Sequence, residues 1–586
     1  MNSHQSNRIT GTHAKGGGRV DRSRPVSFTF DGKSFSGFDG DTLASALLAN
    51  DVHLIGRSFK YHRPRGLLGL GSEEPNALIQ LNRGNRTEPN TRATQIELFD
   101  GLVAQSQNRW PCLKFDVGAV NQLFHKLFPA GFYYKTFMWP ASFWMSYEHV
   151  IRHAAGLGKA PEGPDPDRYE RMHAHYDVLV AGGGPAGLAA ALAAARTGAR
   201  VILADESTEF GGSLLSEDDV EIDGLPSADW AAQVVGELRS MPEVTLLTRS
   251  TVNGYYDHNY LTIAERVTDH IGAVVPNVPR QRIWKVRAKR VVLATGTIER
   301  PLVFRDNDRP GVMLSSAVRG YAVRYGVLAG RRPLIVTSND DGYRTAIALH
   351  DRGARVACIV DLRAEPDGTL VDAARSRGIE IHAGHSLVGS LGRGRVQGAE
   401  IAKMTADGTG LDGAVRRIDC DLIAMSGGFN PTVHLFSQSR GKLTWDTERF
   451  IFVPGTAHEP QVSVGGCNGD FTVTQAIKDG LQKGVEMARE AGFTGRKPAA
   501  PEVSEPASTA ERTLWLLPST KPVGHKGKHF VDFQNDVTAA DLKLATREGY
   551  RSIEHVKRYT TTGMATDQGK TSNVNALAIV SETLGV

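Results

Sequence analysis

Residues 26–50 first alternate apolar and polar positions and then change to a helical spacing. Residues 26–35 alternate around a turn at Asp31, which is the pattern of a β-hairpin. Residues 41–50 carry apolar positions at helical spacing, and Asp41 is the expected N-cap. A glycine-rich stretch follows at 62–71. Hairpin, helix and glycine-rich loop in this order predict a small β domain.

A buried strand, a glycine loop, a long helix and a second strand begin at Tyr176. The loop is Gly-Gly-Gly-Pro-Ala-Gly over 182–187, and acids close the second strand about 20 residues further on. This context predicts a dinucleotide site, with the pyrophosphate at the helix N-terminus and an acid on the ribose. The residues expected to bind it are Gly182, Gly184, Ala186, Gly187, and Asp205 or Glu206.

Further segments resemble the large family of two-dinucleotide-domain flavoproteins. The positions that match this family's cofactor contacts are Gly212, Ser213, Val252, Thr295, Gly296, Gly469, Asp470 and Phe471. Such proteins carry a second, inserted nucleotide domain, whose strand is expected at 333–336 here. In the loop after it, 337–342, only the last glycine remains, and Asp340 and Asp341 would repel a pyrophosphate. We therefore predict one working dinucleotide site and a degenerate second one.

Composition narrows the possibilities without adding chemistry. A chain of 586 residues is too long for one core, and its net charge of +4 gives no case for nucleic acid or membrane binding. The longest uncharged stretch, 178–195, holds four glycines and a proline and belongs to the nucleotide fold. Few cysteines and no signal peptide favour the cytoplasm.

The four cysteines are scattered along the chain, at Cys112, Cys358, Cys420 and Cys467. Their spacing excludes a local four-thiolate cluster, a redox disulfide of the usual spacing and a zinc ribbon. We expect no metal site. The aromatic residues of 110–150, among them Trp110, Tyr133, Tyr134, Phe137 and Trp139, fit either a packed helical linker or a subunit interface.

Two segments resemble iron–sulfur domains that have lost their cysteines. The hairpin, helix and loop are similar to a β-grasp ferredoxin, with Ser72, Glu73 and Glu74 among the places of its thiolates, although a small β domain of no particular ancestry fits too. Residues 528–570 are similar to the bacterioferritin-associated-ferredoxin-like domain. There, Asp532, Gln534 and Asp567 stand in the cysteine positions. Carboxylates are poor ligands for cluster iron.

This cysteine-free arrangement resembles the alpha subunits of heterotetrameric sarcosine oxidase over nearly the whole chain. The resemblance implies an α/β protein with a flavoprotein-like Rossmann core. The implied parts are a disordered tail (1–22), a vestigial 2Fe-2S ferredoxin-like domain (23–105), an aromatic-rich linker or interface (106–175), the dinucleotide-binding domain (176–325 and 415–497), the inserted degenerate domain (326–414), a linker (498–512) and a cluster-less helical module (513–586).

The resemblance also implies an activity. The family oxidises sarcosine to glycine with oxygen, giving hydrogen peroxide and formaldehyde, or 5,10-methylenetetrahydrofolate when folate is present. FAD on the beta subunit oxidises the amine, FMN is covalently attached to beta at the alpha–beta interface, and alpha binds NAD beside beta, gamma and delta partners. No residue of this chain is then expected to be catalytic. The family's folate domain would follow Val586, where the sequence ends.

Three questions stay open at this point. The glycine motif alone fits FAD as well as NAD, and only the resemblance favours NAD. Lys557, Arg558 and Thr561, with the neighbouring threonines, could hold an FMN phosphate or could simply end a surface helix. A free-standing FAD-dependent pyridine-nucleotide oxidoreductase and a non-catalytic scaffold subunit are the alternative functions.

Overall fold

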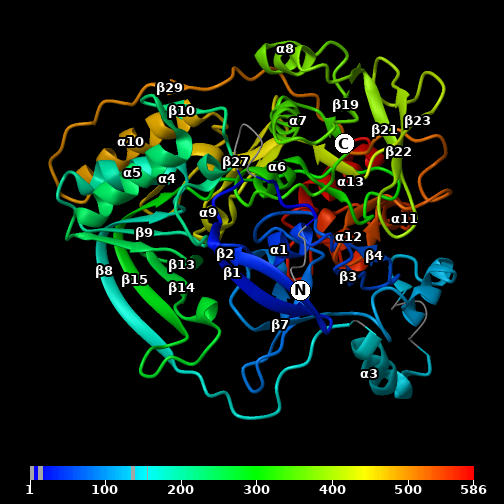
Figure 1. Ribbon diagram of the computed structural model, residues 1–586, viewed down its shortest axis with the longest axis horizontal. Helices are drawn as coiled ribbons and strands as arrows, with labels where there is room; N and C mark the ends of the chain where they lie inside the picture. Colours follow the sequence, from blue (N-terminus) through cyan, green and yellow to red (C-terminus); the bar gives the residue numbers. More distant parts are fainter. Residues whose placement is uncertain (1–5, 11–16, 133–138, 155) are drawn as a thin grey trace. The chain divides into compact units, whose positions relative to one another are not determined.

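The computed structural model describes residues 6–10, 17–132, 139–154 and 156–586 (Figure 1). The chain forms two compact units. The first unit joins three separate segments, Met1–Asp165, Glu299–Gly428 and Ser508–Val586, and the second joins Pro166–Ile298 and Phe429–Ala507. Tyr133, Tyr134 and Phe137 of the aromatic segment lie outside the described residues.

The predicted hairpin and helix are present at the start of the first unit. Its five-stranded sheet has the order β2-β1-β7-β5-β6. Thr42, and not the predicted Asp41, is the N-cap of α1, because Thr42 and Ser45 form a reciprocal capping box. The bounds are β1 Asp21–Phe30, β2 Lys33–Asp39, α1 Leu43–Ala49, β3 Gly56–Arg57, β4 Pro64–Arg65, β5 Leu78–Leu81, β6 Glu88–Arg92 and β7 Leu102–Ser106.

Asn7 and Ile9 are buried before β1, which corrects the expectation of a disordered tail at these two residues. The Asn7 N–H donates to the Ala49 carbonyl (3.2 Å). Ile9 is only 3% exposed, and its N–H donates to Gly326 (2.8 Å). Local composition gave no sign of this, because the partners of Asn7 and Ile9 lie 42 and 317 residues further along the chain.

A parallel sheet of order β17-β24-β18-β19-β20 forms the inserted domain of the first unit. Strands β18 and β24 are neighbours in this sheet. Strands β19 and β20 lie on the β18 side and β17 lies on the β24 side, so the switch point of the sheet is between β18 and β24. The bounds are β17 Val312–Leu314, α6 Ser315–Val323, β18 Pro333–Thr337, α7 Asp341–Asp351, β19 Cys358–Asp361, α8 Thr369–Ser376, β20 Ile381–Ala383, β21 His385–Leu391, β22 Gly398–Lys403, β23 Arg416–Ile418 and β24 Leu422–Ser426.

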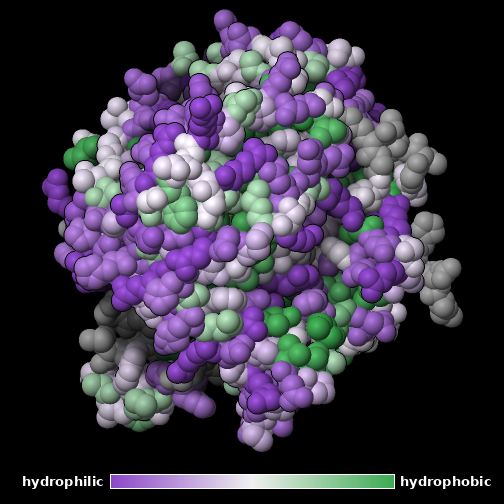
Figure 2. All heavy atoms as spheres, turned by 90° about the vertical axis from the view of Figure 1, so that its left-hand side faces the viewer, coloured by the Kyte–Doolittle hydropathy of each residue, from purple (hydrophilic) through white to green (hydrophobic). Residues whose placement is uncertain are grey.

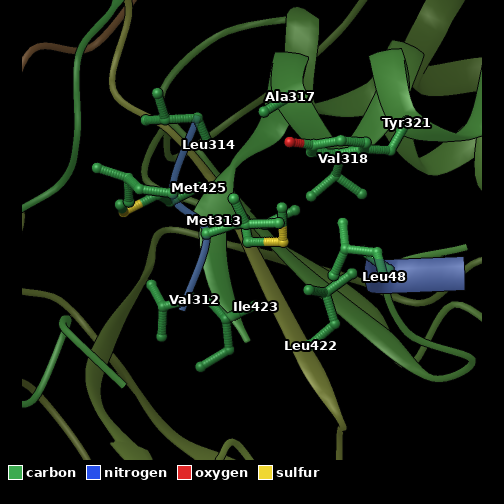
Figure 3. Packing of buried hydrophobic residues seen from close by; sticks show 14 of the residues in the cluster. Leu48, Val312, Met313, Leu314, Ala317, Val318, Tyr321, Leu422, Ile423 and Met425 are labelled. Atoms are coloured by element: carbon green, nitrogen blue, oxygen red, sulfur yellow. The ribbon is translucent and has the colours of Figure 1, made fainter. Parts of the chain in front are cut away.

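One apolar core joins the inserted domain to the N-terminal domain within this unit. Figure 3 shows Leu48 of α1 beside Leu422 of β24, with Met313 of β17 and Tyr321 of α6 in the same cluster. All four side chains are at most 1% exposed. Burying each large apolar side chain contributes about 1.5–3 kcal/mol, so the two domains stabilise each other.

The C-terminal module completes the first unit with a short hairpin and three helices, around a core that includes Val531, Leu542 and Ile579. The bounds are β30 Phe530–Asp532, β31 Val537–Thr538, α11 Ala539–Arg547, α12 Ile553–Thr560 and α13 Asn573–Leu584. The aromatic segment contributes α3, Trp144–Ala154.

The second unit is a Rossmann-type sheet with the order β12-β9-β8-β15-β14-β13, extended by β28 beside β15. Helices α4 and α10 pack side by side (Figure 1). The bounds are β8 Tyr169–Ala181, α4 Pro185–Ala195, β9 Val201–Ala204, β10 Glu221–Ile222, β11 Leu225–Pro226, α5 Ser227–Ser240, β12 Val244–Leu247, β13 Ser250–Tyr256, β14 Tyr260–Arg266, β15 Gln281–Leu293, α9 His434–Gln438, β26 Leu443–Asp446, β27 Ile451–Pro454, β28 Gln461–Ser463, α10 Val473–Glu490 and β29 Val503–Ser504. Strands β16, Thr297–Glu299, and β25, Phe429–Pro431, lie where the chain passes between units.

Hydrophilic residues cover most of the face drawn in Figure 2, with apolar residues gathered in a smaller patch. Along the chain, large exposed apolar side chains concentrate in the aromatic segment, where Trp110 is 69% and Leu123 80% exposed. Exposure leaves both readings of this segment, linker and interface, open. None of the helices in the described ranges is long and apolar enough to cross a membrane.

Candidate nucleotide site and two cluster-like loops

The glycine loop of the second unit has the tight geometry that its sequence predicts. Gly182 follows β8 with φ +103°, and a Cβ there would lie 2.2 Å from the Ala294 carbonyl oxygen. A Cβ on Gly187 would lie 1.8 Å from the Gly182 carbonyl oxygen, so α4 and the loop can approach only through glycine. Gly184 is the N-cap of α4 and offers no capping side chain. The first backbone N–H groups of the helix therefore remain available to an anion.

Asp205 closes this loop from the end of β9. Its carboxylate accepts the Gly183 N–H (2.6 Å) and the Ser207 N–H (2.8 Å). The Asp205 carbonyl oxygen accepts the N–H of Ser250, the first residue of β13, and Val252 follows in that strand. Of the two acids left open by the sequence, Asp205 is the one that the structure places against the glycine loop.

Two later segments of the second unit lie at the same place. The Gly211 N–H donates to the Gly183 carbonyl (2.8 Å), which brings Gly212 and Ser213 next to the loop. A Cβ on Gly465 would lie 2.7 Å from the Cβ of Ala186, so the turn that leads to Gly469, Asp470 and Phe471 meets the start of α4.

Thr295 and Gly296, in the turn after β15, are hydrogen-bonded to Thr432. The Thr295 hydroxyl donates to the Thr432 carbonyl (2.7 Å), and the Gly296 carbonyl accepts the Thr432 N–H (3.0 Å). All of the residues predicted around the glycine fingerprint lie in the second unit. Their contacts with a nucleotide stay a prediction.

Cys467, a buried cysteine beside this site, has no role predicted from the sequence motifs. The Cys467 thiol donates to the Leu293 carbonyl (3.1 Å) and is 1% exposed. Burial raises the pKa of this thiol, which keeps it protonated and unreactive. A structural role, holding the turn against the end of β15, follows from this geometry.

Lys557, Arg558 and Thr561 lie in the first unit. Lys557 and Arg558 stand in the last turn of α12, and Thr561 ends the helix with φ +67°. The Thr561 carbonyl accepts the Asn535 amide (2.8 Å), which fixes the turn. The structure leaves both interpretations of these residues open, the phosphate site and the helix end.

Two glutamates fill the loop that would surround an N-terminal cluster. The Glu74 carboxylate accepts four backbone N–H groups: those of Leu68, Gly69 and Asn76 at 2.7 Å each, and that of Ala77 at 3.1 Å. Glu73 accepts the N–H groups of Leu70 (2.7 Å) and Gly71 (2.9 Å). Two effects on the pKa of Glu74 oppose each other. Burial raises it and the backbone N–H donors lower it, and because burial is the larger effect the pKa is about 7.

The C-terminal module repeats this substitution. Asp532 is 0% exposed and accepts the N–H groups of Asn535 (2.8 Å) and Gly563 (2.7 Å). The Gln534 side chain accepts the Asp567 N–H (3.0 Å), and the Asp567 carboxylate accepts the Gly569 N–H (3.3 Å). Burial, and then the charge of Asp567, raise the pKa of Asp532 to about 7.

Neither loop fits an iron–sulfur cluster. Residues 23–109 and 526–586 contain no cysteine, and within the described ranges no three His, Cys, Asp or Glu residues gather as a metal site would require. The N–H groups that line these loops are satisfied by carboxylates and an amide instead.

A buried ion network joins the two loop regions, and sequence reasoning missed it. Arg65, 1% exposed in its side chain, pairs with Asp308 (2.8 Å) and with Asp536. The Asp536 carboxylate also accepts the N–H groups of Lys60 (2.8 Å) and Tyr61 (2.9 Å). The Arg65–Asp536 partners are 471 residues apart in sequence, so no local pattern could have revealed the pair.

Comparison with known families gives three matches along the chain. A model described as pyridine nucleotide-disulphide oxidoreductase matches residues 176–478, one described as 2Fe-2S iron-sulfur cluster binding domain matches 23–109, and one described as sarcosine oxidase A3 domain matches 526–586. The first covers more than half of the chain.

Individual relatives agree with these matches. The chain is 48% identical over 572 residues to the sarcosine oxidase subunit alpha of Rhizobium meliloti (strain 1021), covering 97% of this chain and 56% of that protein. It is 38% identical to the same subunit of Corynebacterium sp. (strain U-96), covering 97% and 54%. The chain thus spans about half the length of the curated relatives it matches. L-proline dehydrogenase from P. horikoshii shares the fold, with a TM-score of 0.64 and 18% identity over 99% of this chain and 95% of that one.

Proposed function

Since the chain belongs to the pyridine nucleotide-disulphide oxidoreductase family and is a homologue of sarcosine oxidase alpha subunits, we propose that it is the alpha-type subunit of a sarcosine oxidase complex. In this proposal the complex converts sarcosine to glycine with oxygen, giving hydrogen peroxide and formaldehyde. The flavin of a beta-type partner supplies the amine oxidation, gamma- and delta-type subunits complete the assembly, and the complex works in the cytoplasm.

The observation that carries the proposal is the pairing of a formed dinucleotide loop with two cluster loops that cannot bind iron. The Gly182 loop and the uncapped start of α4 suit a pyrophosphate, while Glu74 and Asp532 occupy the cluster loops. Such a chain holds a nucleotide but has no cluster to receive electrons. We propose NAD as that nucleotide, held for stability rather than for hydride transfer, with Asp205 at its ribose.

We propose further that Lys557, Arg558 and Thr561 contribute to an FMN phosphate site at the surface that meets beta. Two cations in the last turn of α12 and a nearby hydroxyl suit a phosphate, which forms strong charge-assisted hydrogen bonds. The free-standing FAD-dependent oxidoreductase is the weaker alternative, because it needs a second nucleotide loop and the loop at 337–342 keeps only its last glycine, Gly342. A non-catalytic scaffold differs only in lacking activity with its partners.

The first experiment is to denature the purified chain and identify the released nucleotide by chromatography and absorbance. One NAD per colourless chain is the expected result. A yellow chain that releases FAD would contradict the proposal at its central site.

The second experiment produces the chain together with beta, gamma and delta partners and measures peroxide and formaldehyde formed from sarcosine. The double variant Lys557→Met/Arg558→Met is expected to form less peroxide from sarcosine while the chain keeps its own nucleotide. Arg551→Met is the matched control, because Arg551 is an exposed cation of the same module outside α12. Assembly without activity would favour the scaffold.

A further inference from the structure

The chain segment Ser508–Thr513 lies across the carboxyl edge of the inserted domain's parallel sheet. The Arg512 N–H donates to the carbonyl of Ser338, directly after β18 (3.0 Å), and the Arg512 guanidinium donates to the carbonyl of Leu362, directly after β19 (3.0 Å). In doubly wound sheets this edge is where nucleotides bind. The segment itself has no helix or strand, and by composition it belonged to a linker.

Asp340 anchors the segment at the place of a pyrophosphate. Asp340 is the N-cap of α7, and its carboxylate accepts the Thr509 N–H (2.6 Å) and the Thr509 hydroxyl (2.9 Å). A pyrophosphate would need the same helix N-terminus. Here a pyrophosphate would meet the Asp340 carboxylate, which already binds Thr509.

Asp361 occupies the place that Asp205 has in the second unit, at the end of the next strand. Its carboxylate is held by the Arg363 guanidinium (2.9 Å) and the Tyr343 hydroxyl (2.8 Å). Arg363 also donates to Asp340 (2.8 Å) and to the Thr509 hydroxyl (2.7 Å). The phosphate position and the ribose position are therefore joined to each other and to the segment through one arginine.

A further ion pair holds the middle of the segment. Arg300, whose side chain is 3% exposed, pairs with Glu511 at 2.9 Å, and Arg300 also stacks on Trp515 (4.6 Å to the ring centroid). The Arg300 guanidinium also donates to the Gly427 carbonyl (2.7 Å), which directly follows β24. The segment is therefore bound at the ends of β18 and β19 and, through Arg300, at the end of β24.

We propose that Ser508–Thr513 is an intramolecular strap that occupies the second dinucleotide crevice of the chain and seals it. Two features then keep a nucleotide out of this crevice: the loop 337–342 keeps only its last glycine, Gly342, and the strap covers the crevice. That each chain binds one nucleotide follows from the strap only together with the proposed function. The seating of the strap does not depend on that function.

Hydrogen exchange of the full chain, read at single amides by mass spectrometry, tests the seating. The Thr509 and Arg512 amides are expected to exchange slowly, unlike that of Ser508, which donates no hydrogen bond within the described part of the chain. The double variant Thr509→Val/Arg512→Met removes the side-chain anchors and leaves the crevice residues intact. We expect about tenfold faster exchange at both amides, the loss of two to three net hydrogen bonds.

Ser508→Ala is the matched control, because Ser508 is exposed beside the anchors, and it should leave both amides unchanged. Thr509 and Arg512 amides that exchange as fast as Ser508 in the unmodified chain would overturn the strap. Equilibrium dialysis against excess NAD tests the seal: a second NAD bound while both amides stay protected would overturn it. Protected amides in a chain that releases no nucleotide would instead contradict the proposed function and support the strap.

Discussion

The substitution Glu299→Gln should abolish a loss of stability that occurs as pH rises from about 6 to about 8. Glu299 is 4% exposed, and its carboxylate accepts the Ser316 N–H (2.8 Å) and hydroxyl (2.6 Å). Burial, and then the charge of Asp341, raise the pKa of Glu299 to about 8. Asp341 itself pairs with Arg319 (2.8 Å). Near neutral pH, Glu299 is therefore protonated.

The sign and size follow from proton linkage. The unfolded chain releases the Glu299 proton near the ordinary value of 4.5, whereas the folded chain keeps it up to about pH 8. The stabilisation is fully present below the lower value and is lost as pH rises to the higher one. From about pH 6 to about pH 8 the loss is about 1.4 kcal/mol per pH unit, or about 3 kcal/mol in total. Glutamine resembles the neutral acid and keeps an acceptor for Ser316, so the variant lacks this slope.

The assay compares the two proteins across pH. A chain with two units need not unfold in one step, so stability is best followed in urea by hydrogen exchange of α6, which contains Ser316. Glu365→Gln, an exposed glutamate in the same inserted domain, is the control and should behave like the unmodified chain. Curves for the unmodified chain and Glu299→Gln that fall in parallel from pH 6 to pH 9 would refute the reasoning.

Three further substitutions test the sites described above. Gly187→Val should empty the nucleotide site, because a Cβ at this position would lie 1.8 Å from the Gly182 carbonyl oxygen. Gly236→Ala in α5 is the control, because a Cβ there meets nothing within 4 Å, and the amount of nucleotide released on denaturation distinguishes the two variants. Arg65→Met should destabilise the first unit by about 3–5 kcal/mol, since it removes the cation paired with the buried Asp536 carboxylate, and a melting temperature equal to that of the unmodified chain would contradict this. Glu74→Gln exchanges one acceptor oxygen for a donor facing backbone N–H groups, so exchange at the glycine-rich loop should rise sharply, with the second unit unaffected as internal control.

Local sequence patterns predicted the elements whose physics is local. The hairpin at Asp31, the strand before Gly182 and the helix after it depend on residues close in the chain, and the structure has all three. The expected N-cap at Asp41 was wrong by one residue. The capping box of Thr42 decides it, while the Asp41 carboxylate binds Arg8 (2.7 Å) instead.

Contacts between distant segments could not be predicted in this way. The glycine fingerprint located the Gly182 loop, but nothing in the sequence around Thr509 indicates that it binds Asp340, which lies 169 residues earlier. The missing cysteines were visible in the sequence. That Glu74 would take over the backbone N–H groups of its loop was not, because this depends on where the loop folds back.

The Arg65 network also bears on how the protein is made. Arg65 leaves the ribosome 471 residues before Asp536, the carboxylate that completes its buried pair. At a synthesis rate of about 5–20 residues per second, this guanidinium waits about 25–95 s for that partner. By the end of that time the second unit has been synthesised up to Ala507, while the first still lacks its last segment. The part of the molecule that begins to form first is therefore the last to be finished, and it is the part that chaperones and proteases have longest to inspect.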